Sequence, residues 1–171
     1  MLRNKKIILC VTGGIAAYKC PGLVRLLVKS GANVRVVMTR AACDFVTPKV
    51  LAALSRHDVW VDFFDASHIW HNHVGLAEWA DIVIVAPLTA NTLSKMAYGA
   101  CDNIVLAVYL SARAPVVVAP AMDLEMYRHV TVRDNLKKLE DRGNIIVLAE
   151  NGELASGLTG EGRMAEPETI L

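Results

Sequence analysis

The chain has 171 residues, 54% of them hydrophobic, and a formal net charge of +1 at pH 7. This length favours a single domain with a substantial core, and no apolar run approaches the roughly 20 residues that a membrane-spanning helix needs. Charges of both signs are scattered along the chain without a basic stripe, which argues against nucleic-acid binding.

Four cysteines are spread along the chain without CxxC spacing and without a metal-like grouping with histidine. They are Cys10, Cys20, Cys43 and Cys101. We interpret them as small hydrophobic residues in a reducing compartment. The first apolar run, 7–11, is too short for a signal-peptide core and lacks a cleavage site, so we expect a cytoplasmic protein.

The chain opens with a strand, a glycine turn and a helix. The uninterrupted β-branched run over 5–11 predicts a strand buried on both faces. Thr12, Gly13 and Gly14 form a turn, and a helix is expected over 15–29. Glycines let the backbone approach a ligand, and the first N–H groups of a helix suit a phosphate. The GxGxxG dinucleotide fingerprint is absent, and a plain tight turn explains the same residues.

The following segments repeat the alternation of strand and helix. The run 34–38 predicts a second strand, with Thr39 at its carboxyl end. Two short helices are expected over 41–45 and 48–54. The segment 58–64 is either an edge strand or an extended loop.

Three histidines follow, at positions His68, His71 and His73. No carboxylate or thiolate stands at ligand spacing among them, so we expect no metal site. We select His73 as the candidate for chemistry because it immediately precedes 76–81, the lead-in to the third strand. The alternative is a hydrogen-bonded surface histidine.

The stretch 82–99 organises the rest of the chain. Its apolar start, 82–85, predicts a buried strand that Pro87 ends. Thr89 can cap the next helix, because its hydroxyl can accept a hydrogen bond from the backbone N–H group two or three residues further on. The polar side chains gathered at this junction are Thr89, Asn91, Thr92 and Lys95. They suit an anion, phosphate above all, although an ordinary capped helix with an exposed lysine has the same pattern.

Further strand and helix units complete the predicted sheet. Asp102 is expected to cap a helix over 104–111 that is apolar nearly all round, which suggests a subunit contact. A third polar loop, 120–127, follows the fourth strand. The remaining predicted elements are a strand over 115–119, a helix over 130–142 and a strand over 145–148.

The segment 150–167 is rich in glycine and mixed charge, and it predicts a long mobile loop. Long loops in compact domains usually act as lids or are disordered. Arg163 is a candidate to clamp an anionic substrate when this loop closes. A frayed tail is the alternative.

The order of elements predicts a single α/β domain with a doubly wound, Rossmann or flavodoxin-like sheet of five or six mostly parallel strands. Polar loops at 12–14, 87–91 and 120–123 each follow a strand. Because the carboxyl ends of parallel strands meet at one edge, we expect the three loops to converge on one crevice.

Five motifs, in order along the whole chain, resemble those of the homo-oligomeric flavin-containing cysteine decarboxylases. They are a phosphate loop at 12–19, an active-site histidine segment formed by His73 and 76–81, a flavin motif at 87–92, a Pro-x-Met-Asn-x-x-Met motif at 120–126, and a substrate-recognition flap at 155–167. The flap and the Trp-Ala-Asp sequence at 79–81 are most similar to the branch that acts on phosphopantothenoylcysteine.

This resemblance implies FMN-dependent decarboxylation of 4'-phosphopantothenoylcysteine to 4'-phosphopantetheine in coenzyme A biosynthesis. The implied cofactor-binding residues are Gly13, Gly14, Ile15, Thr39, Pro87, Thr89, Asn91, Thr92 and Met122. The implied catalytic residues are His73, Asp123 and Ser156, with His73 as base or substrate positioner. The implied substrate-binding residues are Asp123, Met126, Ala155, Ser156, Arg163 and Met164.

The resemblance also implies an organisation. A flavoprotein domain is expected over 1–149, and 150–171 would be the flap and C-terminal segment of the same domain. In this family the site lies between subunits of a trimer, often assembled into a dodecamer. Bifunctional bacterial members continue into a phosphopantothenate–cysteine ligase domain, so a fused or separate ligase partner is expected. Whether this chain is monofunctional or a shortened piece stays open.

Two positions depart from the family pattern. Asp123 stands where the family has asparagine, and Ser156 stands where it has the flap cysteine that is expected to donate a proton in the final reduction. Two alternatives therefore remain: an FMN-binding regulatory or assembly subunit without decarboxylase activity, and a decarboxylase of another cysteine-containing substrate. No nucleic-acid or membrane partner is expected.

Overall fold

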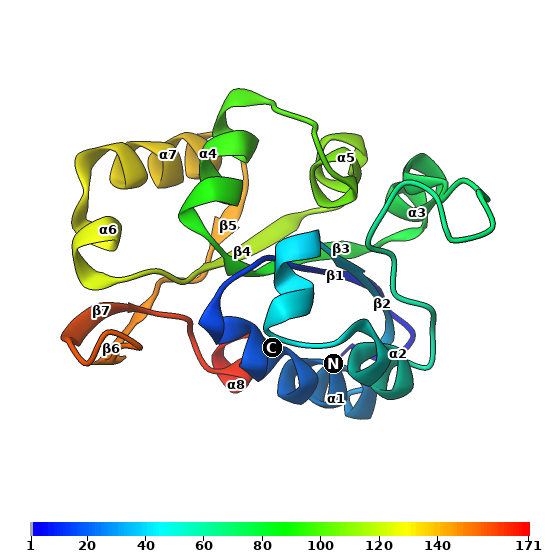
Figure 1. Ribbon diagram of the computed structural model, residues 1–171, viewed down its shortest axis with the longest axis horizontal. Helices are drawn as coiled ribbons and strands as arrows, with labels where there is room; N and C mark the ends of the chain where they lie inside the picture. The colour runs from blue at the N-terminus through cyan, green and yellow to red at the C-terminus, as the bar shows by residue number, and fades with distance from the viewer. Residues whose placement is uncertain (1) are drawn as a thin grey trace.

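A five-stranded parallel sheet forms the centre of the protein in the computed structural model, which describes residues 2–171. The strands lie in the order β2-β1-β3-β4-β5, and every pair is parallel (Figure 1). They are β1 (Lys6–Val11), β2 (Asn33–Met38), β3 (Ile82–Leu88), β4 (Val116–Pro120) and β5 (Ile145–Ile146). This order confirms the predicted flavodoxin-like, doubly wound fold.

Helices cover both faces of the sheet. On one face lie the 3₁₀ turn η1 (Ile15–Lys19), α1 (Cys20–Lys29), η2 (Arg40–Asp44), α2 (Pro48–Ser55) and α8 (Pro167–Ile170). On the other lie α3 (His73–Trp79), α4 (Ala90–Tyr98), α5 (Ile104–Ser111) and α7 (Val130–Asp141), while α6 (Leu124–Arg128) precedes α7 (Figure 1). Because both faces are covered, the strands are mainly apolar, with polar residues only at Lys6 in β1 and at Asn33 and Arg35 in β2.

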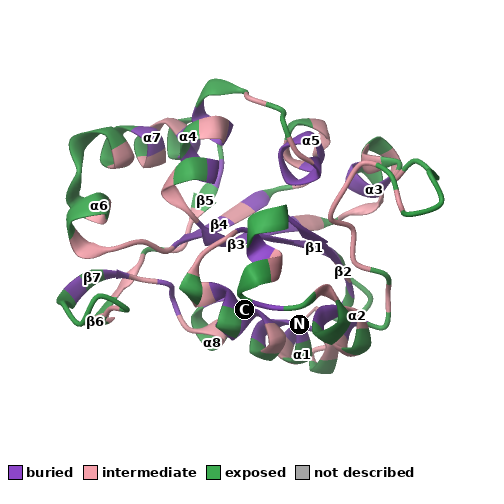
Figure 2. Ribbon diagram, viewed as in Figure 1, coloured by how far each residue is buried: buried purple, intermediate pink, exposed green. Residues whose placement is uncertain are grey.

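The strand β1 shows how the alternating side chains build two cores. All residues from Ile7 to Val11 are fully buried. Leu9 and its neighbours at odd positions pack with α1 and α2, whereas Ile8 and Cys10 pack with α4 and α5. Figure 2 shows the same arrangement as a buried sheet between helices whose outer surfaces are exposed. The continuous apolar run is therefore explained by burial on two faces rather than one.

Two local predictions are wrong: the strand lead-in that was expected after His73, and the cap that was expected for the apolar helix. The segment 73–79 is the helix α3 rather than a loop and a strand lead-in, because the side chain of Asn72 caps it by accepting from the Gly75 N–H at 2.9 Å. The cap of α5 is Asn103, which accepts from the Leu106 N–H at 3.1 Å, and not Asp102. In both cases an asparagine, whose side chain caps as well as aspartate, occupies the N-cap position.

The prediction of a loop without secondary structure over 150–167 is also wrong. Two strands, β6 (Glu150–Glu153) and β7 (Thr159–Arg163), form an antiparallel hairpin that is a sheet of its own. The segment 58–64 is an extended loop that meets the edge of β2 only through an isolated bridge between Trp60 and Val37. Across residues 2–171, no helix is both long enough and apolar enough to cross a bilayer.

Candidate functional site

A single large cavity of about 950 Å³ lies at the carboxyl ends of β1, β3 and β4. Its wall combines the loop after β1, the loop after β2, the start of α4, the loop after β4 and the hairpin β6–β7. The three polar strand-end loops predicted to converge do meet here. This is the place where open parallel sheets bind their ligands, and the volume is that of a typical small-molecule or cofactor pocket.

The loops after β1 and β3 are joined by hydrogen bonds through Thr12. Its hydroxyl donates to the Pro87 carbonyl at 2.6 Å and accepts from the Thr89 N–H at 3.2 Å. Thr12 is fully buried, so neither bond competes with solvent. The Thr89 hydroxyl in turn accepts from the Thr92 N–H at 3.4 Å, which confirms Thr89 as the cap of α4. One threonine therefore holds two walls of the cavity in register.

The glycines after β1 are closely packed against their neighbours. A Cβ added at Gly13 would lie 2.6 Å from the Cβ of Ala41, and one at Gly14 would lie 3.3 Å from the methyl group of Thr89. A side chain at Gly13 would clash with Ala41, whereas one at Gly14 would require Thr89 to shift by a few tenths of an ångström. The first N–H groups of a helix have no partner within the helix, and the residues at the start of η1, Gly14 and Ile15, line the cavity together with Gly13.

The hairpin β6–β7 closes the cavity from the outside. The Met122 N–H donates to the Gly162 carbonyl at 3.0 Å, which fixes β7 on the loop after β4. Gly162 has a φ of +143°, and an added Cβ would lie 2.3 Å from the Met122 carbonyl oxygen. This contact therefore requires glycine at position 162. The segment that was expected to be mobile is docked against the site.

Most of the candidate residues do line the cavity. Those that do are Gly13, Gly14, Ile15, Thr39, Thr89, Asn91, Thr92, Met122, Asp123, Met126, Ala155, Arg163 and Met164. Three do not, and they are Pro87, His73 and Ser156. Pro87 is buried behind the cavity wall and contributes its carbonyl to the Thr12 hydroxyl. Ser156 lies in the exposed turn between β6 and β7, where its hydroxyl accepts from the Leu158 N–H at 3.4 Å.

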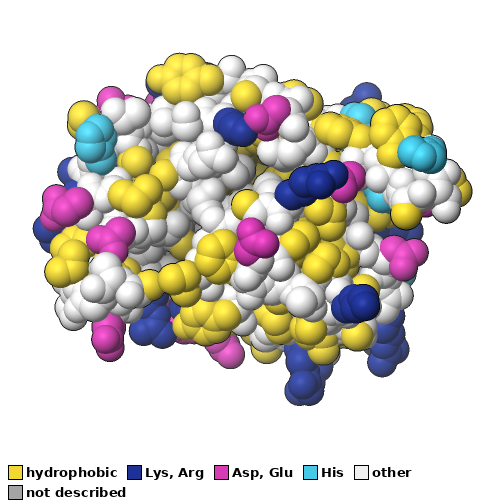
Figure 3. Space-filling view, in the orientation of Figure 1, with side chains coloured by type: hydrophobic (Ala, Val, Ile, Leu, Met, Phe, Trp, Pro, Cys, Tyr) yellow, Lys and Arg dark blue, Asp and Glu magenta, His cyan; other side chains and the backbone are white. Residues whose placement is uncertain are grey.

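His73 stands at the first position of α3 and does not itself line the cavity, although Phe63, which its ring contacts, does. Its ring meets those of Phe63 and Trp70 edge-on, with centroids 5.7 and 5.9 Å apart. Its Nδ1 is buried and has no hydrogen-bond partner among residues 2–171. Figure 3 shows histidine side chains at the edge of the molecule beside the loop that precedes α3. A buried nitrogen without a partner is an unusual cost, so His73 has hydrogen-bonding capacity that its own chain leaves unused.

Asp123 caps the short helix α6 rather than pairing with a cation. Its Oδ1 accepts from the Leu124 N–H at 2.8 Å, and the described residues form no ion pair with it. The guanidinium of Arg163 is bound instead to Glu166 at 2.6 Å. The backbone bond uses one carboxylate oxygen of Asp123 and leaves acceptor capacity for a ligand.

Two of the four thiols are unreactive. Burial raises the pKa of both Cys10 and Cys20 to about 12. They therefore remain neutral thiols at physiological pH and cannot act as nucleophiles, which agrees with their interpretation as core residues. Among residues 2–171, no three His, Cys, Asp or Glu side chains are grouped to hold a metal ion.

The cavity also contains charged residues that the sequence did not single out as site residues. They are Lys19, Arg40, Asp62, Asp102 and Glu153. Arg40 pairs with Asp62 at 2.7 Å, and Asp102 pairs with Lys95. The Lys95 ammonium, through its hydrogen bond, lowers the pKa of Asp102. Of these residues, only Lys19 could have been predicted from the sequence to lie at the site, because it ends the turn that follows Gly13 and Gly14.

Comparison with known proteins gives relatives along the whole chain. The coenzyme A biosynthesis bifunctional protein CoaBC of Bacillus subtilis (strain 168) is 45% identical over 172 residues, which cover 100% of this chain and 42% of that protein. CoaBC of Escherichia coli (strain K12) is 45% identical over 171 residues, with 99% and 42% covered. A cysteine/cysteine sulfinic acid decarboxylase from an unknown prokaryotic organism is 53% identical over 127 residues, with 74% and 35% covered. The chain thus spans less than half the length of these curated relatives.

Solved structures and a family model agree with these relatives. A PPC decarboxylase variant complexed with pantothenoylaminoethenethiol superimposes with a TM-score of 0.88 at 31% identity, covering 98% of this chain and 94% of that one. The FMN-dependent cysteine decarboxylase SpaF gives a TM-score of 0.81 at 30% identity, with 94% and 92% covered. The model of the family described as Flavoprotein matches residues 1–171. Together with the motifs around the cavity, this match establishes that the chain belongs to the Flavoprotein family.

Proposed function

We propose that this chain catalyses the FMN-dependent decarboxylation of 4'-phosphopantothenoylcysteine to 4'-phosphopantetheine, a step of coenzyme A biosynthesis. One observation carries the proposal: the loops after β1, β3 and β4 and the flap hairpin line one cavity, together with residues from four of the five motifs. The CoaBC relatives and the PPC decarboxylase structure support the substrate. We also propose the division into a flavoprotein domain over 1–149 and a flap with C-terminal segment over 150–171.

The residues of the cavity fit FMN in size and in chemistry. Bare backbone at Gly13 and Gly14 offers an approach for a phosphate. Hydroxyl and amide groups of Thr89, Asn91 and Thr92 stand at the start of α4 beside it. The residues that would hold the cofactor are Gly13, Gly14, Ile15, Thr39, Thr89, Asn91, Thr92 and Met122, with Pro87 shaping the loop behind them. When bound, FMN supplies a two-electron acceptor that can return the electron pair.

The substrate side of the cavity is formed by the loop after β4 and by the flap. Asp123, Met126, Ala155, Arg163 and Met164 line it. The cationic guanidinium of Arg163 suits the anionic groups of the substrate. An ionised Asp123 would repel a substrate carboxylate, but its free oxygen can accept from a substrate amide N–H as an asparagine oxygen does. We therefore propose that Asp123 receives an amide N–H and that Arg163 receives an anion.

Two residues are proposed to handle protons. His73 would act as base or substrate positioner, and its Nδ1 has no hydrogen-bond partner among the described residues. Ser156, in the flap turn, would take the place of the proton donor during reduction of the enethiol product. A serine hydroxyl is a much weaker acid than a thiol, so this last proton transfer is expected to be slow or to use water.

We further propose that the protein is a homotrimer or a homododecamer. His73 does not line the cavity of its own chain, and a site shared between two copies would bring His73 to a substrate. Apolar side chains beside it are exposed, among them Ile69 at 63% and Trp70 at 49% of their surface. Exposed apolar groups that gather in one segment mark interaction surfaces. A fused or separate phosphopantothenate–cysteine ligase domain remains part of the proposal, because the CoaBC relatives extend beyond the matched region.

A second function has its own support. The relative with 53% identity over 127 residues is a cysteine/cysteine sulfinic acid decarboxylase, which favours a decarboxylase of a smaller cysteine-derived substrate. The substitutions at Asp123 and Ser156 equally suit an FMN-binding regulatory or assembly subunit without decarboxylase activity. These candidates differ in what the FMN-loaded protein does to substrate.

The test begins with the absorption spectrum of the purified protein, reconstituted with FMN, followed by mass analysis of products from 4'-phosphopantothenoylcysteine and from cysteine. A yellow protein that forms 4'-phosphopantetheine agrees with the proposal. Turnover of cysteine alone favours the second substrate, and a yellow but inert protein favours the regulatory subunit. A protein that cannot be loaded with FMN contradicts all three.

The variant His73→Asn tests the assigned base. We expect unchanged FMN content and a loss of decarboxylation by a factor of about 10² to 10⁴, the usual contribution of a general acid or base. The matched control is His68→Asn, because His68 is exposed and its φ of +60° is one that asparagine tolerates. Full turnover by His73→Asn would remove His73 from the mechanism. Light scattering of the same samples gives the oligomeric state, and a stable flavin-loaded monomer would contradict the trimer.

A further inference from the structure

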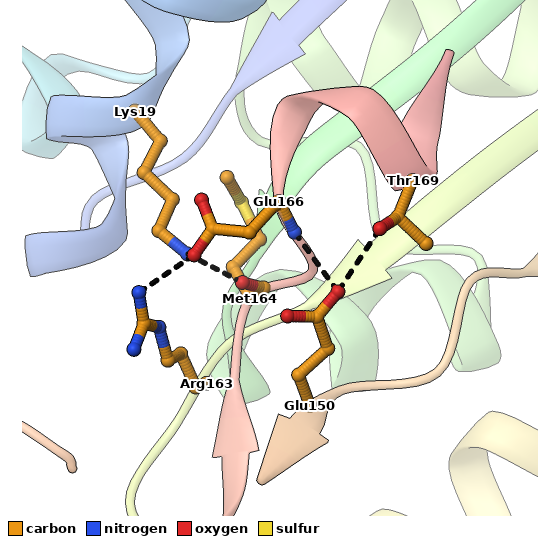
Figure 4. Close-up of polar contacts among 6 residues, drawn as sticks. All are labelled: Lys19, Glu150, Arg163, Met164, Glu166 and Thr169. Atoms are coloured by element: carbon orange, nitrogen blue, oxygen red, sulfur yellow. Dashed lines mark hydrogen bonds and ion pairs between the residues drawn. The ribbon is translucent and has the colours of Figure 1, made fainter. Parts of the chain in front are cut away.

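Five residues from three segments of the chain meet at the base of the flap. Glu166 Oε1 accepts from Lys19 Nζ at 2.9 Å and from Arg163 Nη2 at 2.6 Å. Lys19 Nζ also donates to the Met164 carbonyl at 2.7 Å. The backbone N–H of Glu166 donates to Glu150 Oε1 at 3.2 Å (Figure 4). The network therefore joins η1, both strands of the hairpin and the start of α8.

The sharing of one carboxylate by two cations distinguishes this network from the other ion pairs of the cavity. Arg40 and Lys95 each have a carboxylate partner of their own, Asp62 and Asp102. Glu166 alone serves both Lys19 and Arg163 among the residues that the structure describes. Glu166 therefore fixes two cations at once. The N–H donors of Arg163 that this bond leaves unused suit an anionic ligand.

Lys19 anchors the network in the core. Its side chain is only 5% exposed, and its ammonium has two acceptors, the Glu166 carboxylate and the Met164 carbonyl. A buried ammonium requires such partners. Met164 and Ala165 are fully buried beside it. The hydrogen bond with Lys19 lowers the pKa of Glu166, so that Glu166 remains ionised at neutral pH.

Arg163 lines the cavity, as Lys19 and Met164 of the network also do. Its side chain is 40% exposed, lines the cavity and lies across Gly152, where an added Cβ would be 3.2 Å from Nη1. Of its five N–H donors, the contact with Glu166 uses one. The remaining donors are available to a ligand, and the direction of the guanidinium is set by the single bond to Glu166.

We propose that Glu166 is a positioning residue: held by Lys19, it aims the guanidinium of Arg163 into the cavity so that it receives the anionic group of the substrate. The inference rests on the proposed function, since it takes the substrate to be anionic, and it adds Glu166 and Lys19 to the residues on which substrate binding depends. Glu166 is not a catalytic residue, because it acts through Arg163 and lies outside the lining of the cavity.

The first experiment measures steady-state kinetics of the FMN-loaded enzyme with 4'-phosphopantothenoylcysteine. In Glu166→Gln the guanidinium loses its charged partner and its fixed direction, so KM is expected to rise about tenfold while kcat stays within about twofold. The matched control is Glu168→Gln, which removes the same charge two residues away at an exposed position of α8 and should keep the parental KM.

A double-mutant cycle separates positioning from a general structural effect. In an Arg163→Gln background, Glu166→Gln should raise KM no further, because the group that it positions is absent. An equal rise of KM in both backgrounds would overturn the inference. So would a loss of kcat at unchanged KM.

A second measurement does not depend on turnover. Trypsin cleaves after Arg163, and the described segment 150–171 contains no other lysine or arginine. In the parent protein the bond between Arg163 and the buried Met164 should be cut slowly, whereas Glu166→Gln should be cut about tenfold faster. Equal rates in Glu166→Gln and Glu168→Gln would overturn the inference even if the proposed function holds. Faster cleavage in an enzyme that lacks decarboxylase activity would instead contradict the proposed function alone.

Discussion

The dependence of the flap on Gly162 gives the sharpest prediction. In Gly162→Ala the new Cβ would lie 2.3 Å from the Met122 carbonyl oxygen, at a residue whose φ is +143°. A side chain in this backbone region costs about 1–3 kcal/mol, and loss of the bond between the Met122 N–H and the Gly162 carbonyl costs about 1 kcal/mol. We therefore expect docking of β7 to be weakened by about 3 kcal/mol.

Hydrogen–deuterium exchange followed by mass spectrometry measures this effect. Since 1.36 kcal/mol corresponds to a factor of ten, the Met122 amide should exchange about 10² times faster in the variant. The amides of β1 and β3 should keep their protection, because β6 and β7 form a separate sheet and can open without the core. Opening of the flap alone is thus distinguished from global unfolding.

The matched control is Gly157→Ala in the turn of the same hairpin. Gly157 also has a positive φ, +85°, but an added Cβ would meet no atom within 4 Å. This variant carries only the backbone cost of about 1 kcal/mol, and it should leave the Met122 amide protected. The reasoning is refuted if the Met122 amide exchanges at the same rate in the two variants, because the contact with the loop after β4 would then not hold the flap.

The remaining predictions concern the core, the cofactor and the ionisation of Glu166. Leu9→Ala leaves a cavity at a fully buried site between the sheet and its helices, and it should lower the free energy of unfolding by about 2–5 kcal/mol in urea titrations. Its control is Leu148→Ala, at a side chain 70% exposed, which should change the free energy of unfolding by less than about 0.5 kcal/mol. Asn91→Asp places a negative charge beside the proposed FMN site and should weaken FMN binding at least tenfold in fluorescence titrations; unchanged affinity would place FMN elsewhere. The pKa of Glu166 is lowered in the folded protein by Lys19, so its contribution to stability is present above the pKa of an unfolded glutamate and is lost as the pH falls through the lowered value. The side-chain carboxyl ¹³C signal of Glu166 should therefore titrate at lower pH than in Lys19→Met; coincident titration would contradict the pairing.

The apolar runs of this sequence determined the central sheet by themselves. Four to six consecutive β-branched or aliphatic residues, as in Ile7–Val11 and Ile82–Val85, can be buried only where both faces of a strand are covered. That requirement leads to parallel strands between layers of helices, and parallel strands bring their carboxyl ends to one edge. The convergence of the loops at Gly13, Thr89 and Met122 followed from the same reasoning.

The hairpin and the helix at His73 were missed for local reasons. The strands of the hairpin carry glycines and charges instead of alternating apolar residues. Their pairing therefore rests on backbone hydrogen bonds and on docking to Met122, and neither contact can be predicted from the residue pattern. The start of α3 depends on one asparagine cap within a segment rich in histidine and aromatic residues. Such a short helix has too few turns to give a clear periodicity.

Only the tertiary structure decided how the charges of the site are paired. Lys19 and Glu166 are 147 positions apart, and neither has a neighbour in the sequence that predicts the contact. Their bond forms because the sheet places η1 beside the end of β7, where a buried ammonium must find acceptors. Arg163 pairs with Glu166, three residues further along the chain, rather than with Asp123. The hydrophobic pattern thus specified where the cavity would open, whereas the partner of Lys19 depended on a distance that exists only in the folded chain.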